Sequence, residues 1–123
     1  MIRMFFFAAC AAFLAMALPG CGQAEQKTKI GISIPAADHG WTGGGVYWAN
    51  QAKKSIEAAN PGYEVIVSTA RDAAEQVDKV ENLLVQGIKA LVILPHEPGP
   101  LTAVCEQAKA QNVKLVVVDR GLT

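Results

Sequence analysis

An alternation of short apolar runs with helical patterns begins at Lys29 and constrains the fold more than any other feature of this sequence. The apolar runs predict strands over residues 30–34, 64–69, 90–94 and 114–119. Between these runs, apolar side chains recur every three or four residues, which predicts helices over 46–59, between Asp72 and Gly87, and over 101–111. Such an alternation is typical of a parallel sheet covered by helices. We therefore expect an α/β fold with an open parallel sheet and helices on both faces.

Local signals mark the ends of the predicted helices. Asp72 and Glu75 have the spacing of a capping box, in which the Asp72 carboxylate accepts from the Glu75 backbone N–H. This makes Asp72 a helix cap in preference to a ligand contact. Gly87 is suited to close the same helix, and Asn60-Pro61-Gly62 ends the helix before it.

Residues 1–20 have the layout of a secretory signal peptide. Arg3 supplies positive charge, and residues 4–18 form an apolar stretch of 15 residues, shorter than the roughly 20 that span a bilayer as a helix. The sequence Leu18-Pro19-Gly20-Cys21 then resembles a bacterial lipobox, which predicts a lipid on the Cys21 sulfur. Residues 21–28 would be the lipid-anchored tether of a protein in the periplasm or cell envelope. The alternative is ordinary cleavage after Ala24, which would leave the protein free of the membrane.

The three cysteines do not predict a disulfide framework. Cys10 is lost with the signal peptide, and a lipid on Cys21 leaves Cys105 without a partner. Cys105 shares one predicted helix face with Leu101 and Ala108, so we expect a small buried hydrophobic residue there.

The overall charge argues against a nucleic-acid partner. Lys plus Arg and Asp plus Glu both total 11, so the formal net charge is zero, whereas a nucleic-acid surface needs a basic stripe.

Polar and aromatic residues gather in the loops that follow the four predicted strands. In an open parallel sheet, ligands bind just outside the carboxyl ends of the strands. Lysines and turn residues occupy the loops of the opposite edge. The candidate ligand-binding residues are Asp38, His39 and Trp41 after the first strand, Arg71 after the second, His96 and Glu97 after the third, and Asp119 and Arg120 after the fourth.

These residue types suit a neutral polyol. Carboxylates accept hydroxyl hydrogens, and the arginine fork donates to hydroxyl oxygens. An aromatic ring such as Trp41 can lie against the apolar face of a sugar ring. Two alternatives stay open: Asp119 and Arg120 could form a surface ion pair of little consequence, and Trp41 could be a core or hinge residue.

From Lys29 to Thr123 the sequence resembles the periplasmic ribose-binding protein family, the type I sugar-binding proteins that feed ABC importers. The motifs that carry the resemblance are Lys29-Ile30-Gly31-Ile32-Ser33-Ile34-Pro35, the loop from Asp38 to Trp41, Glu81-Asn82-Leu83-Leu84-Val85-Gln86-Gly87, and Val117-Val118-Asp119-Arg120.

The resemblance implies a Rossmann-like amino-terminal lobe over residues 29–123, with a second lobe and a hinge beyond Thr123. It implies that Asp119 and Arg120 hydrogen-bond the sugar hydroxyls and that the Asp38 to Trp41 loop supplies further contacts. It also implies a monosaccharide ligand and an ABC permease partner in the inner membrane. Ribose binders of the family carry an Asn where this chain has Leu94-Pro95. That contact would pass to His96 or Glu97, so ribose itself is not specified.

Catalytic and cofactor-binding alternatives lack their motifs. Gly40, Gly43, Gly44 and Gly45 do not give the glycine spacing of a dinucleotide fold, and no phosphate-loop sequence is present. The histidines and carboxylates after the first and third predicted strands, namely Asp38, His39, His96 and Glu97, lack the spacing of a zinc site. No Gly-x-Ser-x-Gly elbow is present either. We therefore expect a binding protein that is not an enzyme and uses no cofactor.

The fourth predicted strand would be an apolar edge as the chain stands, so we expect the amino-terminal part of a longer protein. The main functional alternative is a receptor of the same fold that binds a non-sugar small molecule or serves a chemoreceptor or sensor kinase.

Overall fold

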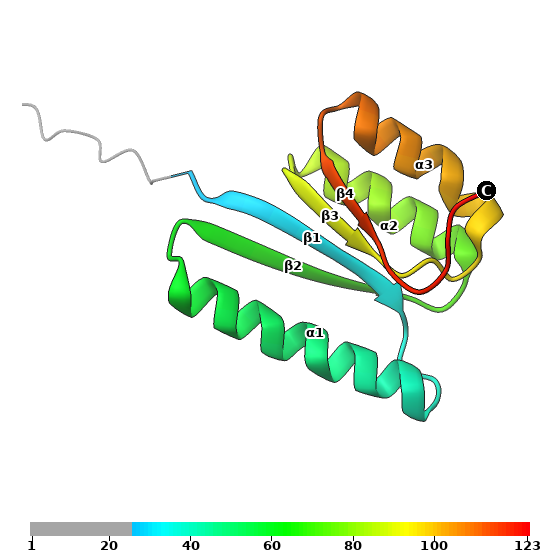
Figure 1. Cartoon of the computed structure of the whole chain (residues 1–123), viewed down its shortest axis with the longest axis horizontal. Coiled ribbons are helices and arrows are strands. Elements are labelled where there is room, and N and C mark those ends of the chain that lie inside the picture. Colours follow the sequence, from blue (N-terminus) through cyan, green and yellow to red (C-terminus); the bar gives the residue numbers. More distant parts are fainter. Residues whose placement is uncertain (1–25) are drawn as a thin grey trace, which may run out of the picture.

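The structure is a computed structural model that describes residues 26–123. The predicted signal peptide and the predicted lipidation site Cys21 lie outside the described residues. Strands and helices alternate without exception, as predicted (Figure 1). The elements are β1 (Thr28–Pro35), α1 (Gly40–Ala59), β2 (Tyr63–Ala70), α2 (Ala73–Val85), β3 (Ala90–Ile93), α3 (Pro98–Ala110) and β4 (Lys114–Val117).

The four strands form one parallel sheet with the order β2-β1-β3-β4. This confirms the predicted open parallel sheet. Because every strand runs the same way, the loops that follow the strands meet at one edge, which we call the carboxyl edge. Within the described sheet β2 and β4 are the outer strands, so the loop after β2 is separated from the loops after β3 and β4.

Helices cover both faces of the sheet, which also confirms the prediction. Helix α1 packs on β1 and β2, while α2 and α3 pack against each other on the other face (Figure 1). The larger core cluster lies under α2 and α3 and includes Val80, Leu83, Leu91, Ile93 and Leu101. Cys105 belongs to this cluster as a buried free thiol, as predicted, and burial raises the pKa of the thiol.

Both predicted signals at the ends of α2 are confirmed. The Asp72 carboxylate accepts from the Glu75 backbone N–H at 2.8 Å. At the other end Gly87 has a φ of 78°, a left-handed conformation that glycine adopts without a side-chain clash. The Gly87 N–H donates to the Leu84 carbonyl at 2.9 Å, and the Ile88 N–H to that of Leu83 at 3.5 Å. This is the Schellman arrangement of a helix end.

Several predicted boundaries were wrong, and three of the differences have a local cause. Helix α1 begins at Gly40 and not at residue 46, because its first turns carry glycines and exposed side chains that show no apolar stripe. Helix α3 begins at Pro98 and not at residue 101, since proline is accommodated in the first turn, where no N–H partner is needed. Strand β4 ends at Val117, and Asp119 adopts a φ of 66°, so Asp119 follows the strand instead of completing it.

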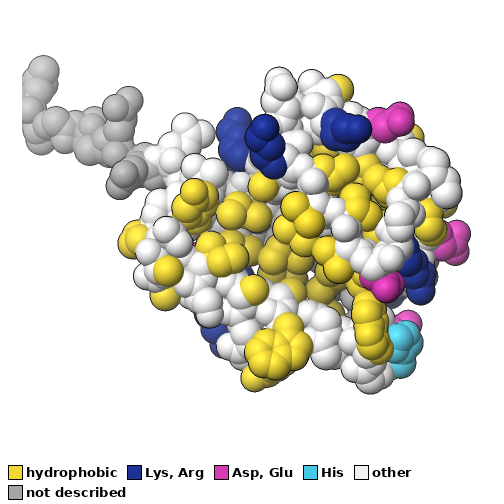
Figure 2. Space-filling model, in the orientation of Figure 1, with side chains coloured by type: hydrophobic (Ala, Val, Ile, Leu, Met, Phe, Trp, Pro, Cys, Tyr) yellow, Lys and Arg dark blue, Asp and Glu magenta, His cyan; other side chains and the backbone are white. Residues whose placement is uncertain are grey.

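One apolar surface of the sheet is open within residues 26–123. Helix α1 leaves a groove of about 380 Å³ beside β3 and β4. Its lining includes Trp41, Trp48, Val92, Leu94 and Val118. Figure 2 shows hydrophobic side chains spread across the middle of the face in view. Trp48, which is 69% exposed, belongs to this surface. None of the helices in the described part of the chain is both long and apolar enough to cross a bilayer.

Candidate functional site

Three loops at the carboxyl edge enclose two adjoining hollows of about 50 and 90 Å³. We call them together the carboxyl-edge pocket. They share Pro35, His39, Thr42 and Arg120, which come from the ends of β1, α1 and β4. Six of the eight predicted ligand-binding residues line the pocket, and these are Asp38, His39, Trp41, His96, Asp119 and Arg120.

The loop after β1 is held by a buried threonine that the sequence analysis missed. The Thr42 hydroxyl lies 2.8 Å from Asp38 Oδ1 and 3.0 Å from the His39 carbonyl, and it accepts from the His39 backbone N–H at 3.2 Å. The bond from Thr42 lowers the pKa of Asp38, and the nearby His39 ring acts in the same direction. Asp38 therefore presents an ionised acceptor at the pocket at neutral pH.

Arg120 bridges two of the loops. Its guanidinium Nη1 donates to the main-chain carbonyl of His96, and its Nε lies 3.8 Å from Asp119 Oδ2. The Asp119 and Arg120 side chains are 50% and 57% exposed, so water screens their mutual attraction. The guanidinium keeps further N–H groups that can donate to a ligand.

The position of Trp41 distinguishes between two of the roles predicted for it, a ligand contact and a core residue. Trp41 lies in the first turn of α1, not in the preceding loop, and it is 62% exposed. Its exposure is inconsistent with a core residue. It lines both the carboxyl-edge pocket and the apolar groove, so one ring joins the polar site to the apolar surface.

Gln76 is a second residue that the sequence analysis missed. It is fully buried in α2 and hydrogen-bonds the loop after β3. A signal was available in the sequence, because Gln76 lies one turn before Val80 on the buried face of the helix. A polar side chain at such a position needs partners that satisfy its amide.

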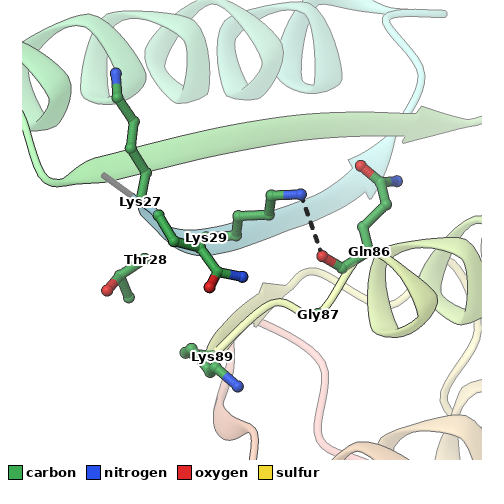
Figure 3. A pocket seen from close by; sticks show the side chains of 7 residues that line it. Lys27, Thr28, Lys29, Gln86, Gly87 and Lys89 are labelled. Atoms are coloured by element: carbon green, nitrogen blue, oxygen red, sulfur yellow. Dashed lines mark hydrogen bonds between the residues drawn. The ribbon is translucent and has the colours of Figure 1, made fainter. Parts of the chain in front are cut away.

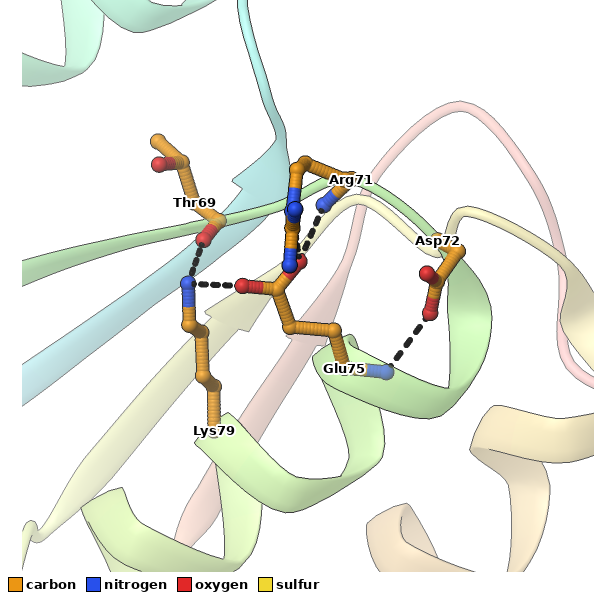
Figure 4. A network of polar contacts seen from close by, with 5 residues as sticks. All are labelled: Thr69, Arg71, Asp72, Glu75 and Lys79. Atoms are coloured by element: carbon orange, nitrogen blue, oxygen red, sulfur yellow. Dashed lines mark hydrogen bonds and ion pairs between the residues drawn. The ribbon is translucent and has the colours of Figure 1, made fainter.

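Arg71 and Glu97 lie outside the carboxyl-edge pocket. Arg71 follows the outer strand β2 and turns toward α2, where its Nε contacts Glu75 Oε2 at 3.0 Å (Figure 4). Lys79 contacts the other oxygen of Glu75 at 2.8 Å. The hydrogen bonds from Lys79 and from the Arg71 backbone and side chain lower the pKa of Glu75 to about 2. Glu97 is exposed at the start of α3 and makes no cap hydrogen bond.

A larger hollow of about 310 Å³ lies at the opposite edge of the sheet (Figure 3). It is lined by three lysines, Lys27, Lys29 and Lys89, together with the end of α2. Lys29 Nζ already donates to the Gln86 carbonyl at 3.2 Å, which satisfies the end of the helix. The larger volume of this hollow therefore does not make it the ligand site. We assign the ligand site to the carboxyl edge, where hydrogen-bond acceptors, donors and an aromatic ring converge.

The chemical groups of the pocket suit a ligand that carries several hydroxyl groups. It offers carboxylate acceptors from Asp38 and Asp119, guanidinium donors from Arg120, and the exposed ring of Trp41. Within residues 26–123, His, Cys, Asp and Glu side chains do not gather in a group of three that could hold a metal ion.

Comparisons with known proteins extend over most of the chain. A sequence model of the periplasmic binding protein domain matches residues 30–123. The ribose import binding protein of Bacillus subtilis is 38% identical over 72 residues, which are 56% of this chain and 24% of that protein. The multiple sugar-binding periplasmic protein of Azospirillum brasilense is 30% identical over 99 residues, covering 79% of this chain and 26% of that protein.

Solved structures agree with the sequence comparisons. The ABC transporter solute-binding protein of Clostridium phytofermentans, solved with bound β-D-glucose, is 28% identical with a TM-score of 0.67. The match covers 77% of this chain and 28% of that one. The chain thus spans about a quarter of the length of the curated relatives that it matches.

Proposed function

The chain belongs to the family of periplasmic binding protein domains, and on this basis we propose that it captures a monosaccharide outside the cytoplasm and delivers it to an ABC-type importer. The observation that carries the proposal is the carboxyl-edge pocket, where Asp119 and Arg120 follow β4 beside Asp38, His39 and Trp41. The relatives named for ribose and for multiple sugars, and the solved relative with bound glucose, support a sugar as the ligand class.

The role of each side chain follows from its chemistry. Asp119 and Asp38 accept hydrogen bonds from sugar hydroxyls, and Arg120 donates to hydroxyl oxygens. Trp41 lies against the apolar face of the sugar ring. His96, whose main chain is fixed by Gln76 and Arg120, lines the same pocket and offers a ring nitrogen to the ligand. The proposed role is binding, and no bond of the ligand is made or broken.

We propose that residues 29–123 act as one lobe of a two-lobe binder. The hollows of about 50 and 90 Å³ are small beside the roughly 300–1,000 Å³ of typical ligand pockets. The carboxyl edge therefore offers one wall of a site, and a second lobe that closes over it would exclude water from the sugar.

The proposed location is the periplasm or cell envelope, with a lipid on Cys21 and the residues between Cys21 and β1 as the tether; Thr28, which was predicted to be part of the tether, is the first residue of β1. The apolar stretch of residues 4–18, which Cys21 closely follows, supports this arrangement. Cells grown with an alkyne-tagged fatty acid should label the protein, and Cys21→Ser should abolish the label and release the protein from the membrane fraction. Equal labelling of both forms would contradict the anchor.

The sugar site is tested by a matched pair of arginine variants. Arg120 lines the pocket, whereas Arg71 lies outside it and pairs with Glu75. Calorimetric titration of the protein with D-ribose, D-xylose and D-glucose should show binding of at least one sugar. Arg120→Ala should weaken it by about 10- to 150-fold, the value of a hydrogen bond to a charged group, and Arg71→Ala by less than about twofold. Equal losses, or a loss confined to Arg71→Ala, would contradict the assignment.

A further inference from the structure

The side chain of Gln76 is fully buried and makes three hydrogen bonds that join three parts of the fold. Its Nε2 donates to the Leu94 carbonyl at 2.9 Å and lies 3.2 Å from Ser33 Oγ on β1. Its Oε1 accepts from the His96 backbone N–H at 2.7 Å. Both amide hydrogens and the amide oxygen therefore have partners.

The same main chain that Gln76 holds is also held by Arg120. The His96 N–H donates to Gln76, and the His96 carbonyl accepts from Arg120 Nη1. These two bonds lie on either side of the His96 Cα, so together they restrict both backbone torsions of that residue. A continuous path of hydrogen bonds thus runs from the buried face of α2 to a guanidinium that lines the carboxyl-edge pocket.

Core packing alone does not account for a glutamine at this position. Burial of an amide is unfavourable unless every polar group is paired, and an apolar side chain of similar size would fill the same space. The amide differs from an apolar side chain because its hydrogen bonds fix the positions of two main-chain groups, the Leu94 carbonyl and the His96 N–H. The groups that it fixes belong to the loop after β3, which contributes Pro95 and His96 to the pocket.

We propose that Gln76 is a positioning residue for the ligand site, which sets the loop after β3 and, through the His96 carbonyl, the orientation of the Arg120 guanidinium. This inference rests on the proposed function, because it takes Arg120 as a ligand contact. Gln76 itself does not touch the ligand. Its effect reaches the sugar through the geometry of His96 and Arg120.

The test compares Gln76→Met with Val80→Ala in the intact protein. Methionine keeps the volume of the side chain but leaves the His96 N–H and the Leu94 carbonyl without partners. Val80 is equally buried one turn further along α2 and has no polar side-chain group, so Val80→Ala reports a general loss of core packing. Both variants are titrated with D-ribose, D-xylose and D-glucose at a temperature at which circular dichroism shows them folded.

Gln76→Met should lose about tenfold or more in sugar affinity, and Val80→Ala less than about twofold. A Gln76→Met protein that binds sugar like the parent would overturn the proposal, as would equal losses in the two variants. If Gln76→Met does not fold, Gln76→Asn is used instead. Asparagine keeps the amide but is one methylene shorter, so it cannot reach Leu94 and His96 together, and the affinity should again fall by about tenfold or more. An affinity equal to that of the parent would overturn the proposal.

A readout without sugar separates this inference from the proposed function. In ¹⁵N-arginine spectra, rotation of the Arg120 guanidinium should be slow in the parent and in Val80→Ala, and faster in Gln76→Met. If the parent binds no sugar but this difference is seen, the proposed function fails and the positioning role stands. If sugar binds and the guanidinium is unaffected by Gln76→Met, the positioning role fails alone.

Discussion

The guanidinium of Arg120 donates a hydrogen bond from Nη1 to the main-chain carbonyl of His96. These residues follow β4 and β3, two neighbouring strands of the sheet, so the bond ties the ends of adjacent loops. A long side chain that is held in this way loses less rotamer freedom when it binds a ligand. Arg120 is therefore partly arranged for binding before any ligand arrives.

Asp119→Gly should weaken sugar binding without weakening the fold. Asp119 has a φ of 66°, a conformation that glycine adopts readily, so the change removes the carboxylate and also relieves backbone strain. We expect the affinity to fall by about 10- to 150-fold, the range for a hydrogen bond to a charged group. Titration calorimetry and thermal melting of the same samples give the two values. Unchanged affinity would remove Asp119 from the site.

Gly87→Ala should destabilise the protein by about 1–2 kcal/mol, the cost of a left-handed conformation for a residue with a side chain. Gly87 has a φ of 78°, and a Cβ added there would meet no atom within 4 Å, so conformation alone sets the cost. Urea unfolding measures the change. Gly44→Ala is the control, because Gly44 lies in α1 without a positive φ, does not precede a proline, and should gain up to about 1 kcal/mol. Equal effects at the two sites would contradict the assigned helix end.

Leu91→Ala should cost about 2–5 kcal/mol of unfolding free energy, the range for deleting a buried leucine side chain. Leu91 is fully buried on β3, between the two neighbouring strands β1 and β4. Val85 is 87% exposed at the end of α2, so Val85→Ala should change stability by less than about 0.5 kcal/mol. A small effect at Leu91 in urea unfolding would mean that the sheet does not pack as described.

Glu75→Gln should flatten the acid limb of the stability profile. The pKa of Glu75 is about 2 in the folded protein, below the ordinary value of 4.5, so the unfolded chain binds its proton first as the pH falls. The stabilisation from this carboxylate is complete above pH 4.5 and is lost as the pH falls toward 2. Urea midpoints between pH 2 and pH 6 should therefore slope less steeply in Glu75→Gln than in the parent. Parallel profiles would show that the contacts to Arg71 and Lys79 do not persist in solution.

The sequence predicted every strand and helix because this fold is patterned locally. Parallel strands buried on both faces are continuously apolar, and each helix carries a stripe with helical spacing. The starts of α1 and α3 were placed too late, since glycines and a proline occupy the first turns and leave no apolar stripe to detect. End signals with a specific chemistry, at Asp72 and Gly87, were placed correctly.

The candidate site could be predicted from the sequence less completely than the fold. Strand order decides which loops come together, and the pattern of apolar runs does not reveal it. Arg71 follows β2, which lies on the other side of β1 from β3 and β4, so its loop stays apart from the loops after β3 and β4. Thr42 and Gln76 were missed for a related reason. The role of Thr42 depends on its contact with Asp38, and that of Gln76 on its contacts with the loop after β3. The sequence alone does not show which residues a given side chain contacts.

The most direct test of the central claim is a thermal-shift screen of the protein, freed of co-purified ligand, against pentoses, hexoses and amino acids. A ligand that binds only the folded state raises the melting temperature with the logarithm of its concentration over Kd. A sugar-binding role predicts a rise with one or a few monosaccharides, which Asp119→Gly reduces. A cooperative melting transition that no sugar shifts, or that an amino acid shifts instead, would contradict it.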